Sequence, residues 1–379
     1  MFFVSREALR QKYVATSFNS TAQYLHTRFW KPDNQDLRFQ TELLANRHDW
    51  KSLGQGWEGK VFVYRDSVIK TYDTVRSPFR NCAPANYSIA RWPTEIPASL
   101  HFGGSISSNA SRDDDDWAAK ANYEGFLPVK AYFMASASPD SPEEWHLVTP
   151  LVKGGSLLTL ASKLSMDPQP KSYREMDAMY RPTFNHLLEN LSMFHKSGYC
   201  HDDVKPSNIF VQSESQWLLG DLGNVREIYH PYHSSRIWRD SKQIADCRAN
   251  DAVRALLSYL KFIQVSMPNQ DAFNAALLEG RQSLSRLLWW TLADAPRMSA
   301  EELRRRSMIE YPEAMPEQDI RNRYPLSSRA YALARFFSDR GVTKLAVDYM
   351  LWTTLTEARA RLWGFVWLFD LPAMQSCRV

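Results

Sequence analysis

Residues 201–210 read His201-Asp202-Asp203-Val204-Lys205-Pro206-Ser207-Asn208-Ile209-Phe210. The segment places two carboxylates, a lysine and an amide between two apolar parts of the chain. A further carboxylate, Asp221, stands directly before Leu222-Gly223. An Asp with a Lys two positions later, an Asn five positions later and a second Asp before a Gly is typical of a site that transfers a phosphoryl group. Asn and Asp oxygens are also the hard ligands that suit Mg²⁺.

These two segments resemble the catalytic and metal loops of the protein kinase superfamily. The family patterns are H-R-D-x-K-x-x-N and D-F-G, and this chain reads H-D-D-V-K-P-S-N and D-L-G. The resemblance implies that Asp203 orients or accepts the proton of the attacking hydroxyl and that Lys205 balances charge on the moving phosphoryl group. It also implies Mg²⁺ (or Mn²⁺) ligands at Asn208 and Asp221. The alternative is an ordinary polar loop before a strand.

A glycine pattern lies upstream, where residues 53–61 read Leu53-Gly54-Gln55-Gly56-Trp57-Glu58-Gly59-Lys60-Val61. This G-x-G-x-x-G-x-V pattern also occurs in dinucleotide-binding folds, in which a helix follows. Here two strand patterns follow, at 61–64 and 68–72, and this context favours the kinase glycine-rich loop. The resemblance implies that four residues of the loop contact ATP, namely Gly54, Gly56, Gly59 and Val61.

The second of these strands contains Lys70, which matches the kinase lysine that holds the α- and β-phosphates. Val68 lies two positions earlier, where the family lines the adenine slot. Glu95 is the candidate carboxylate that pairs with Lys70, near the start of a short helix for which Thr94 is the expected N-cap. The alternatives are an exposed surface lysine and a helix carboxylate favoured by the dipole.

Two more strand patterns, at 126–133 and 145–149, lead into a segment that resembles the kinase hinge. Thr149 is then the gatekeeper, and the backbone of Pro150, Leu151 and Val152 meets the edge of adenine. Phe210 corresponds to the residue below the adenine ring. Beyond the catalytic loop, Asp251 resembles the aspartate that braces the loop backbone.

The resemblance covers about residues 51–308 and implies an α+β, bilobal protein-kinase-like fold. We expect a small lobe with an antiparallel β-sheet at 51–152 and a larger helical lobe at 153–308. An N-terminal extension at 1–50 and a helical C-terminal extension at 309–379 flank them. The extension at 309–379 contains amphipathic patterns at 327–338 and 343–363, separated by Arg340-Gly341, which either pack on the large lobe or dock a protein partner.

The composition limits the partners and the compartment. Of the 379 residues 44% are hydrophobic and 13% aromatic, so a sizeable core can form. A net charge of +4, dispersed along the chain, argues against a nucleic-acid partner. The four cysteines show no paired spacing, which predicts neither a disulfide framework nor a zinc site and favours a reducing compartment. No signal peptide or membrane-length apolar run is recognisable, so we expect a cytoplasmic or nuclear location without membrane contact.

Three functions remain open. The first is an active serine/threonine-type protein kinase that transfers the γ-phosphoryl group of MgATP to a protein hydroxyl, as Lys205 indicates. The second is a pseudokinase scaffold, because no A-P-E triplet follows the metal loop and Asp202 replaces the arginine that usually reads activation-segment phosphorylation. The third is a small-molecule kinase of related fold. The altered motifs look most like those of divergent kinase-like proteins of filamentous fungi.

Overall fold

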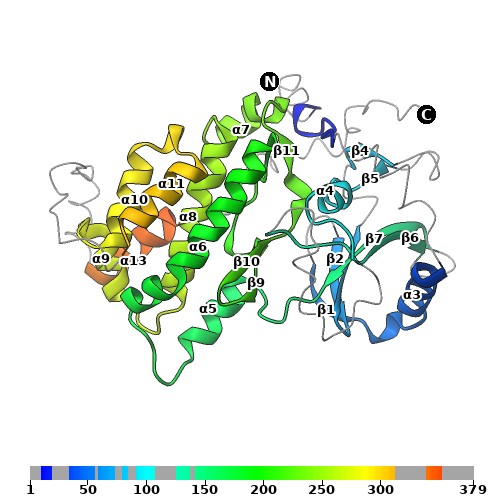
Figure 1. The fold of residues 1–379 in the computed structure, drawn as a ribbon, viewed down its shortest axis with the longest axis horizontal. Helices are drawn as coiled ribbons and strands as arrows, with labels where there is room; N and C mark the ends of the chain where they lie inside the picture. The colour runs from blue at the N-terminus through cyan, green and yellow to red at the C-terminus, as the bar shows by residue number, and fades with distance from the viewer. Residues whose placement is uncertain are drawn as a thin grey trace. The chain divides into compact units, whose positions relative to one another are not determined.

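The computed structural model describes residues 10–18, 34–55, 59–72, 79–83, 91–106, 125–136, 141–311 and 339–351. The chain divides into two compact units. The sheet unit consists of 1–152, 219–240 and 357–379, and the helical unit consists of 153–218 and 241–356. Figure 1 gives the order of the elements along the chain.

An antiparallel sheet of five strands, in the order β1-β2-β3-β7-β6, is the centre of the sheet unit (Figure 1). The strands are β1 (Lys51–Gln55), β2 (Gly59–Tyr64), β3 (Ser67–Tyr72), β6 (Ala131–Ser136) and β7 (Glu143–Pro150). On one face Ile69, Val148 and Phe133 pack with Leu43 of helix α3 (Asn34–Ala45) and with Trp50. Successive strand residues face opposite sides of a sheet, so the residues on either side of Ile69 point away from this core.

Shorter elements complete the sheet unit. They are η1 (Arg47–Asp49), β4 (Asn81–Cys82), β5 (Arg91–Trp92), α4 (Glu95–Phe102), η5 (Leu222–Asn224), β11 (Arg226–Glu227), η6 (Pro231–Ser234) and α7 (Arg236–Asp240). Helix α4 buries Ile96 and Leu100 in a second apolar cluster with Trp92, Trp145 and Leu147. This cluster fixes α4 beside β3 and β7, because each buried apolar side chain contributes about 1.5–3 kcal/mol.

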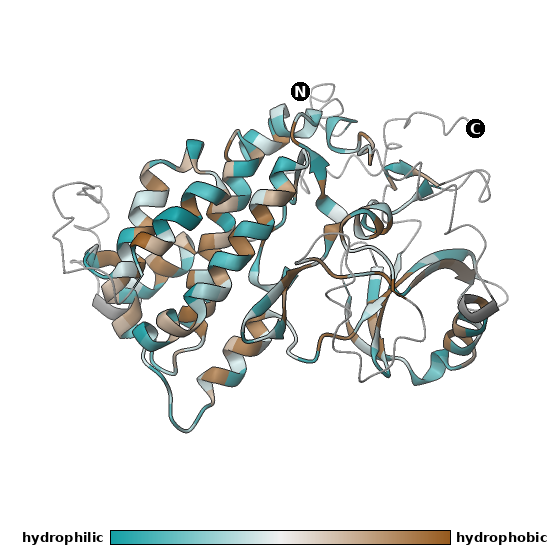
Figure 2. Cartoon of the chain, viewed as in Figure 1, coloured by the Kyte–Doolittle hydropathy of each residue, from teal (hydrophilic) through white to brown (hydrophobic). Residues whose placement is uncertain are grey.

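The helical unit is built around two long helices. Its elements are α5 (Leu157–Ser165), α6 (Tyr173–Lys196), β8 (Tyr199–Cys200), η4 (Pro206–Asn208), β9 (Ile209–Ser213), β10 (Gln216–Leu219), α8 (Cys247–Val265), α9 (Asp271–Glu279), α10 (Ser283–Ala293), η7 (Ala295–Arg297), α11 (Ala300–Ile309) and α13 (Asp339–Met350). Phe184 of α6 stacks on Tyr259 of α8, with ring centroids 4.4 Å apart. Helix α6 alternates hydrophobic and hydrophilic residues along its length (Figure 2), as expected for a helix with one buried stripe. Helix α8 is instead buried on nearly all sides.

The expected fold class is confirmed, and several expected boundaries are wrong. The strand expected from Phe126 begins only at Ala131, since Pro128 cannot donate to a sheet ladder. Helix α6 begins at Tyr173, where Ser172 and Glu175 form a capping box. Gly341 lies inside α13 instead of separating two helices.

The absence of disulfides expected from the cysteine spacing is also wrong. Cys200 and Cys247 form a disulfide with a Cα–Cα distance of 6.0 Å. The two cysteines are 47 positions apart in the sequence, and the fold, not a short spacing motif, brings them together. The cysteines therefore no longer argue for a reducing compartment. Within the described residues, no helix is long and apolar enough to cross a membrane.

Candidate active site

The sheet unit holds Lys70 between two carboxylates. Its Nζ donates to Oε2 of Glu95 and lies 2.8 Å from Oδ1 of Asp221. The hydroxyl of Tyr72 donates to the same Oε2 of Glu95 at 2.6 Å. The structure thus brings together Lys70, Glu95 and Asp221, which the sequence analysis proposed as separate parts of one site.

Glu95 is the most buried of the three charged residues, with 6% of its surface exposed. Burial raises the pKa of its carboxyl, and the nearby Asp221 raises it further, while Lys70 and Tyr72 lower it. Glu95 is the first residue of α4, whose expected N-cap Thr94 makes no capping bond. The hydroxyl of Thr94 instead donates to Asn81 and accepts from Arg80, so the expectation of a side-chain cap at Thr94 is wrong.

The sheet register groups the predicted nucleotide residues on one face. Val61 of β2 is opposite Lys70, and Val68 is opposite Thr149 of β7. Residues that are directly opposite in neighbouring strands point to the same side, and Val68 and Lys70 share a side because they are two positions apart. All four are only partly buried, in contrast to Ile69 on the other face, which is fully buried.

The structure restricts two of the segments that are predicted to contact the nucleotide, the glycine-rich loop and the hinge segment. A Cβ at Gly59 would lie 1.7 Å from the carbonyl oxygen of Thr71, so β2 and β3 can pair here only with glycine. Gly56 lies outside the described residues. In the hinge, the N–H of Leu151 donates to the carbonyl of Asp66 at 2.8 Å. This N–H of Leu151 is therefore used within the protein, and the expected contact of the Pro150–Val152 backbone with adenine stays a prediction.

The backbone at Asp221 adopts an unusual conformation. Its φ of 56° and ψ of 59° are left-handed, which costs energy for a residue other than glycine. Arg80 donates to the carbonyl of Gly223 two positions later, and Leu222 is buried. These contacts hold the turn in the conformation that aims the carboxylate of Asp221 at Lys70.

The helical unit surrounds Asp203 with donors. Lys205 Nζ lies 2.7 Å from Oδ2 of Asp203, and Arg254 Nη2 lies 3.1 Å from its Oδ1. The side-chain amide of Asn208 donates to the Asp203 carbonyl at 3.0 Å. Since Asn208 uses its nitrogen in this contact, its oxygen points elsewhere. The side-chain oxygen of Asn208 is a hard donor of the kind that Mg²⁺ prefers.

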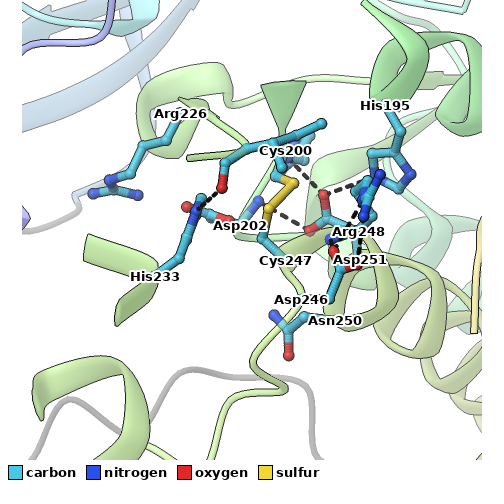
Figure 3. Close-up of a disulfide and its surroundings, with 12 residues drawn as sticks. His195, Cys200, Asp202, Arg226, His233, Asp246, Cys247, Arg248, Asn250 and Asp251 are labelled. Atoms are coloured by element: carbon cyan, nitrogen blue, oxygen red, sulfur yellow. Dashed lines mark hydrogen bonds and ion pairs between the residues drawn. A yellow bond between two sulfur atoms is a disulfide. The ribbon is translucent and has the colours of Figure 1, made fainter. Parts of the chain in front are cut away.

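The backbone of the catalytic loop is attached to helix α8. The carboxylate of Asp251 accepts the N–H of His201 at 2.6 Å and the N–H of Asp202 at 3.0 Å. His195 Nε2 lies 3.2 Å from the same carboxylate, as Figure 3 shows. Asp251 is fully buried, so these partners replace the water it has lost. The bracing contact expected for Asp251 is present.

Phe210 lies in β9, in the strand that follows the catalytic loop. It forms an isolated bridge with Ser156, and the next residue, Val211, donates its N–H to the carbonyl of Gly155 at 2.8 Å. The Gly154-Gly155 segment after the hinge is thus tied to β9. Its close approach also explains Gly154, where a Cβ would lie 2.2 Å from the Val211 carbonyl oxygen.

The family model for the protein kinase domain matches residues 131–245, which include Thr149, Asp203, Lys205, Asn208 and Asp221. The match supports a protein kinase domain over these residues. The match contains both segments that resemble the catalytic and metal loops. The residues of the glycine-rich loop, Lys70 and Glu95 lie outside the matched range.

Curated kinases are similar to short parts of the chain. The eIF-2-alpha kinase GCN2 of Schizosaccharomyces pombe is 25% identical over 154 residues, which are 39% of this chain and 9% of that protein. The serine/threonine-protein kinase ssn3 of Emericella nidulans is 38% identical over 66 residues, 17% of this chain and 16% of that protein. The serine/threonine-protein kinase cds1 of S. pombe is 30% identical over 91 residues, 24% and 18% respectively. The chain thus spans under a fifth of each relative's length.

Two residues of this kinase site were missed by the sequence analysis. Tyr72 is two positions after Lys70 and therefore on the same side of β3, a signal that was available. Arg254 is three positions after Asp251, which places both on one face of α8. Neither position belongs to a kinase motif, and only the packing shows that Tyr72 contacts Glu95 and that Arg254 contacts Asp203.

Proposed function

We propose that the chain is an active protein kinase of the serine/threonine type, which transfers the γ-phosphoryl group of MgATP to a protein hydroxyl. The observation that carries the proposal is the hydrogen-bonded pair of Lys70 and Glu95, with Asp221 beside it. A protein kinase is competent only when this lysine–glutamate pair and the metal-loop aspartate are both in place. The sequence alone left the pair open, because Glu95 lies at the very start of α4.

Each residue then has a chemical task. Lys70, oriented by Glu95, binds the α- and β-phosphates, and the sheet face with Val61, Val68 and Thr149 packs against the adenine. The carbonyl of Pro150 and the N–H of Val152 meet the adenine edge, since the N–H of Leu151 is used within the protein. When bound, Mg²⁺ neutralises phosphate charge, and Asn208 and Asp221 are its ligands.

The catalytic loop acts on the acceptor. Asp203 orients the substrate hydroxyl and takes its proton, while Lys205 stabilises charge on the phosphoryl group in flight. Arg254 holds Oδ1 of Asp203, and Oδ2, which accepts from Lys205 and Asn208, is the oxygen that faces the substrate hydroxyl. The lysine two positions after Asp203 favours a serine or threonine acceptor over tyrosine, and it argues against a small-molecule kinase.

The test compares the full chain with Asp203→Asn and with Asp167→Asn, an exposed aspartate that serves as the matched control. Each protein is incubated with MgATP and dephosphorylated casein, and mass spectrometry counts the phosphate transferred. We expect Asp203→Asn to lower transfer by about 100-fold or more and to keep the thermal shift that MgATP causes. Equal phosphate incorporation by wild type and Asp203→Asn contradicts the proposal, and so does a wild type that gains no phosphate and transfers none.

A second variant tests the metal ligand. Asp221→Asn keeps a similar volume and removes the negative charge that a divalent cation needs. We expect it to lose the part of the ATP thermal shift that depends on Mg²⁺. A thermal shift with the same dependence on Mg²⁺ in Asp221→Asn and wild type contradicts the assignment of Asp221.

A further inference from the structure

The Cys200–Cys247 disulfide joins two segments that are both tied to the catalytic loop. Cys200 is the last residue of β8, and His201-Asp202-Asp203 follows it directly. Cys247 is the first residue of α8, after the N-cap Asp246. Figure 3 shows the S–S bond near Asp251, whose carboxylate accepts from the loop backbone, and His195, which contacts the same carboxylate.

Helix α8 touches the loop at three points in matching order. Cys247 bonds to Cys200, Asp251 accepts from His201 and Asp202, and Arg254 donates to the Val204 carbonyl at 3.1 Å and to Asp203. These contacts involve five consecutive residues, 200–204. Positions four and seven after Cys247 lie on its own helix face, so one stripe of α8 meets the whole start of the loop. The disulfide is the covalent end of this stripe.

The disulfide lies at the first turn of α8, the part of the helix that opens most easily. The first turn of an α-helix lacks half of its backbone hydrogen bonds and frays more easily than the interior. Asp251 lies in the second turn from the start of α8, so fraying of the first turn loosens its hold on His201 and Asp202. A bond from Cys247 to Cys200 keeps the first turn against the loop even when backbone hydrogen bonds open.

We propose that the Cys200–Cys247 disulfide is a positioning element for Asp203 and that its reduction lowers the rate of phosphoryl transfer. The proposal rests on the proposed kinase function. In the redox step, the S–S bond accepts two electrons and two protons from a dithiol such as dithiothreitol. Two thiols form, and dithiothreitol closes to its own cyclic disulfide. The bond acts through Asp251 and Arg254, and neither cysteine touches the substrate.

Burial sets how the bond can be reached. Cys200 is fully buried and Cys247 is 1% exposed, so a reductant reaches the sulfurs only when the first turn of α8 opens. Reduction of the folded protein is therefore expected to be slow and to accelerate when the loop loosens. Replacing both cysteines by serine gives the protein without this bond directly, because serine is close in size to cysteine and forms no disulfide. We call this protein uncoupled.

The experiment compares wild type, Cys200→Ser/Cys247→Ser and the matched control Cys82→Ser, which removes another disulfide-bonded cysteine, in β4. Each is assayed for transfer from MgATP to casein, with and without dithiothreitol. We expect the double variant to show a kcat about 10- to 100-fold below that of oxidised wild type, as for a small misplacement of a catalytic group. The KM for ATP should stay within about twofold, and Cys82→Ser should match wild type. Dithiothreitol should lower the kcat of wild type and leave the double variant unchanged.

Hydrogen exchange supplies a readout that needs no activity. Asp251 protects the amides of His201 and Asp202, so their exchange should be at least about tenfold faster in the double variant, while amides in the middle of α6 stay unchanged. If exchange is faster throughout the double variant, or if circular dichroism shows that the variant is unfolded, the comparison is made with wild type reduced by dithiothreitol. Equal kcat and equal exchange in oxidised and uncoupled protein overturn the proposal. A wild type without transfer refutes the kinase function, and exchange alone then decides whether the bond positions the loop.

Discussion

At the scale of single residues, the site depends on the charge of Glu95. Its pair with Lys70 exists only while the carboxyl is ionised, and burial raises the pKa of that carboxyl. Activity should therefore fall as the pH drops through this raised pKa, earlier than for an ordinary glutamate. The hydrogen bond from Tyr72 opposes the shift, because it stabilises the ionised form. Tyr72 thus keeps the pair charged over a wider pH range.

Removing this hydroxyl gives the first prediction at this scale. Tyr72→Phe should move the acid limb of kcat/KM for ATP to higher pH, while activity well above that limb stays close to wild type. The measurement is a pH profile of phosphate transfer. Tyr64→Phe, in the neighbouring strand β2, is the control and should keep the limb in place. An unchanged acid limb in Tyr72→Phe shows that Glu95 does not limit activity in acid.

The residues that the sequence predicted and those that it missed differ in one respect. Asp203, Lys205 and Asn208 are defined by fixed spacing within one loop, because the chemistry needs them at those positions. Tyr72 and Arg254 act through contacts with residues far away in the chain, Glu95 and Asp203. Spacing places Tyr72 on the same side of β3 as Lys70, but these partners become neighbours only after folding, so spacing alone does not predict the contacts.

At the scale of elements, two glycines of the same sequence motif differ in their surroundings. Gly54 lies in β1 and Gly59 lies in β2. A Cβ at Gly59 would overlap the Thr71 carbonyl at 1.7 Å, whereas a Cβ at Gly54 has no heavy atom within 4 Å among the described residues. Gly59 is therefore required by the sheet itself. Gly54 is free for a different task, the approach of phosphates under the proposed function.

The prediction is a difference between two alanine variants. Gly59→Ala should destabilise the protein by about 1–3 kcal/mol, the usual effect of overpacking, because β2 must move away from β3. Gly54→Ala should change the free energy of unfolding by less than about 0.5 kcal/mol, as for an open surface position. Thermal or urea unfolding without nucleotide measures both. Equal stability of the two variants would disprove the steric argument.

The element boundaries show where sequence patterns are weak. The apolar and polar alternation located β2, β3 and β7, since each strand has one face in a core. The apolar pattern from Phe126 predicts an earlier start for β6, but Phe126 forms only an isolated bridge to Leu219. Gly341 was taken for a helix end, but a helix accepts one glycine at about 1 kcal/mol relative to alanine, and α13 continues through it.

At the scale of the whole molecule, the two units carry different sensitive groups. The buried disulfide lies in the helical unit. Two buried histidines with lowered pKa values, His146 and His230, lie in the sheet unit. Burial lowers the pKa of His146 to about 4, and burial together with Arg226 and Arg80 lowers that of His230 to about 3. Acid should therefore act on the sheet unit, whereas reduction should act on both units, because Cys82 of the sheet unit is also disulfide-bonded.

The acid response follows from linkage. Below pH 6.5 the unfolded chain binds a proton at His146, while the folded protein binds it only near pH 4, so acid favours unfolding. The stability that neutral His146 contributes is complete above about pH 6.5 and is lost as the pH falls toward 4. A difference of this size corresponds to roughly 3 kcal/mol. The ring stacks on Phe133 at 4.9 Å between centroids, so a protonated imidazole there also loses its water without gaining a full partner.

The variant His146→Phe should consequently weaken the pH dependence of the stability of the sheet unit. An aromatic ring keeps the stacking on Phe133 and cannot be protonated, so the variant should lose less stability than wild type between pH 7 and pH 4. Urea unfolding followed by hydrogen exchange of β3 and β7 measures the sheet unit separately from the helical unit. His48→Gln is the control, since the side chain of His48 is 75% exposed and should leave the slope unchanged. The same slope in His146→Phe and wild type would mean that His146 is not the group that makes the sheet unit sensitive to acid.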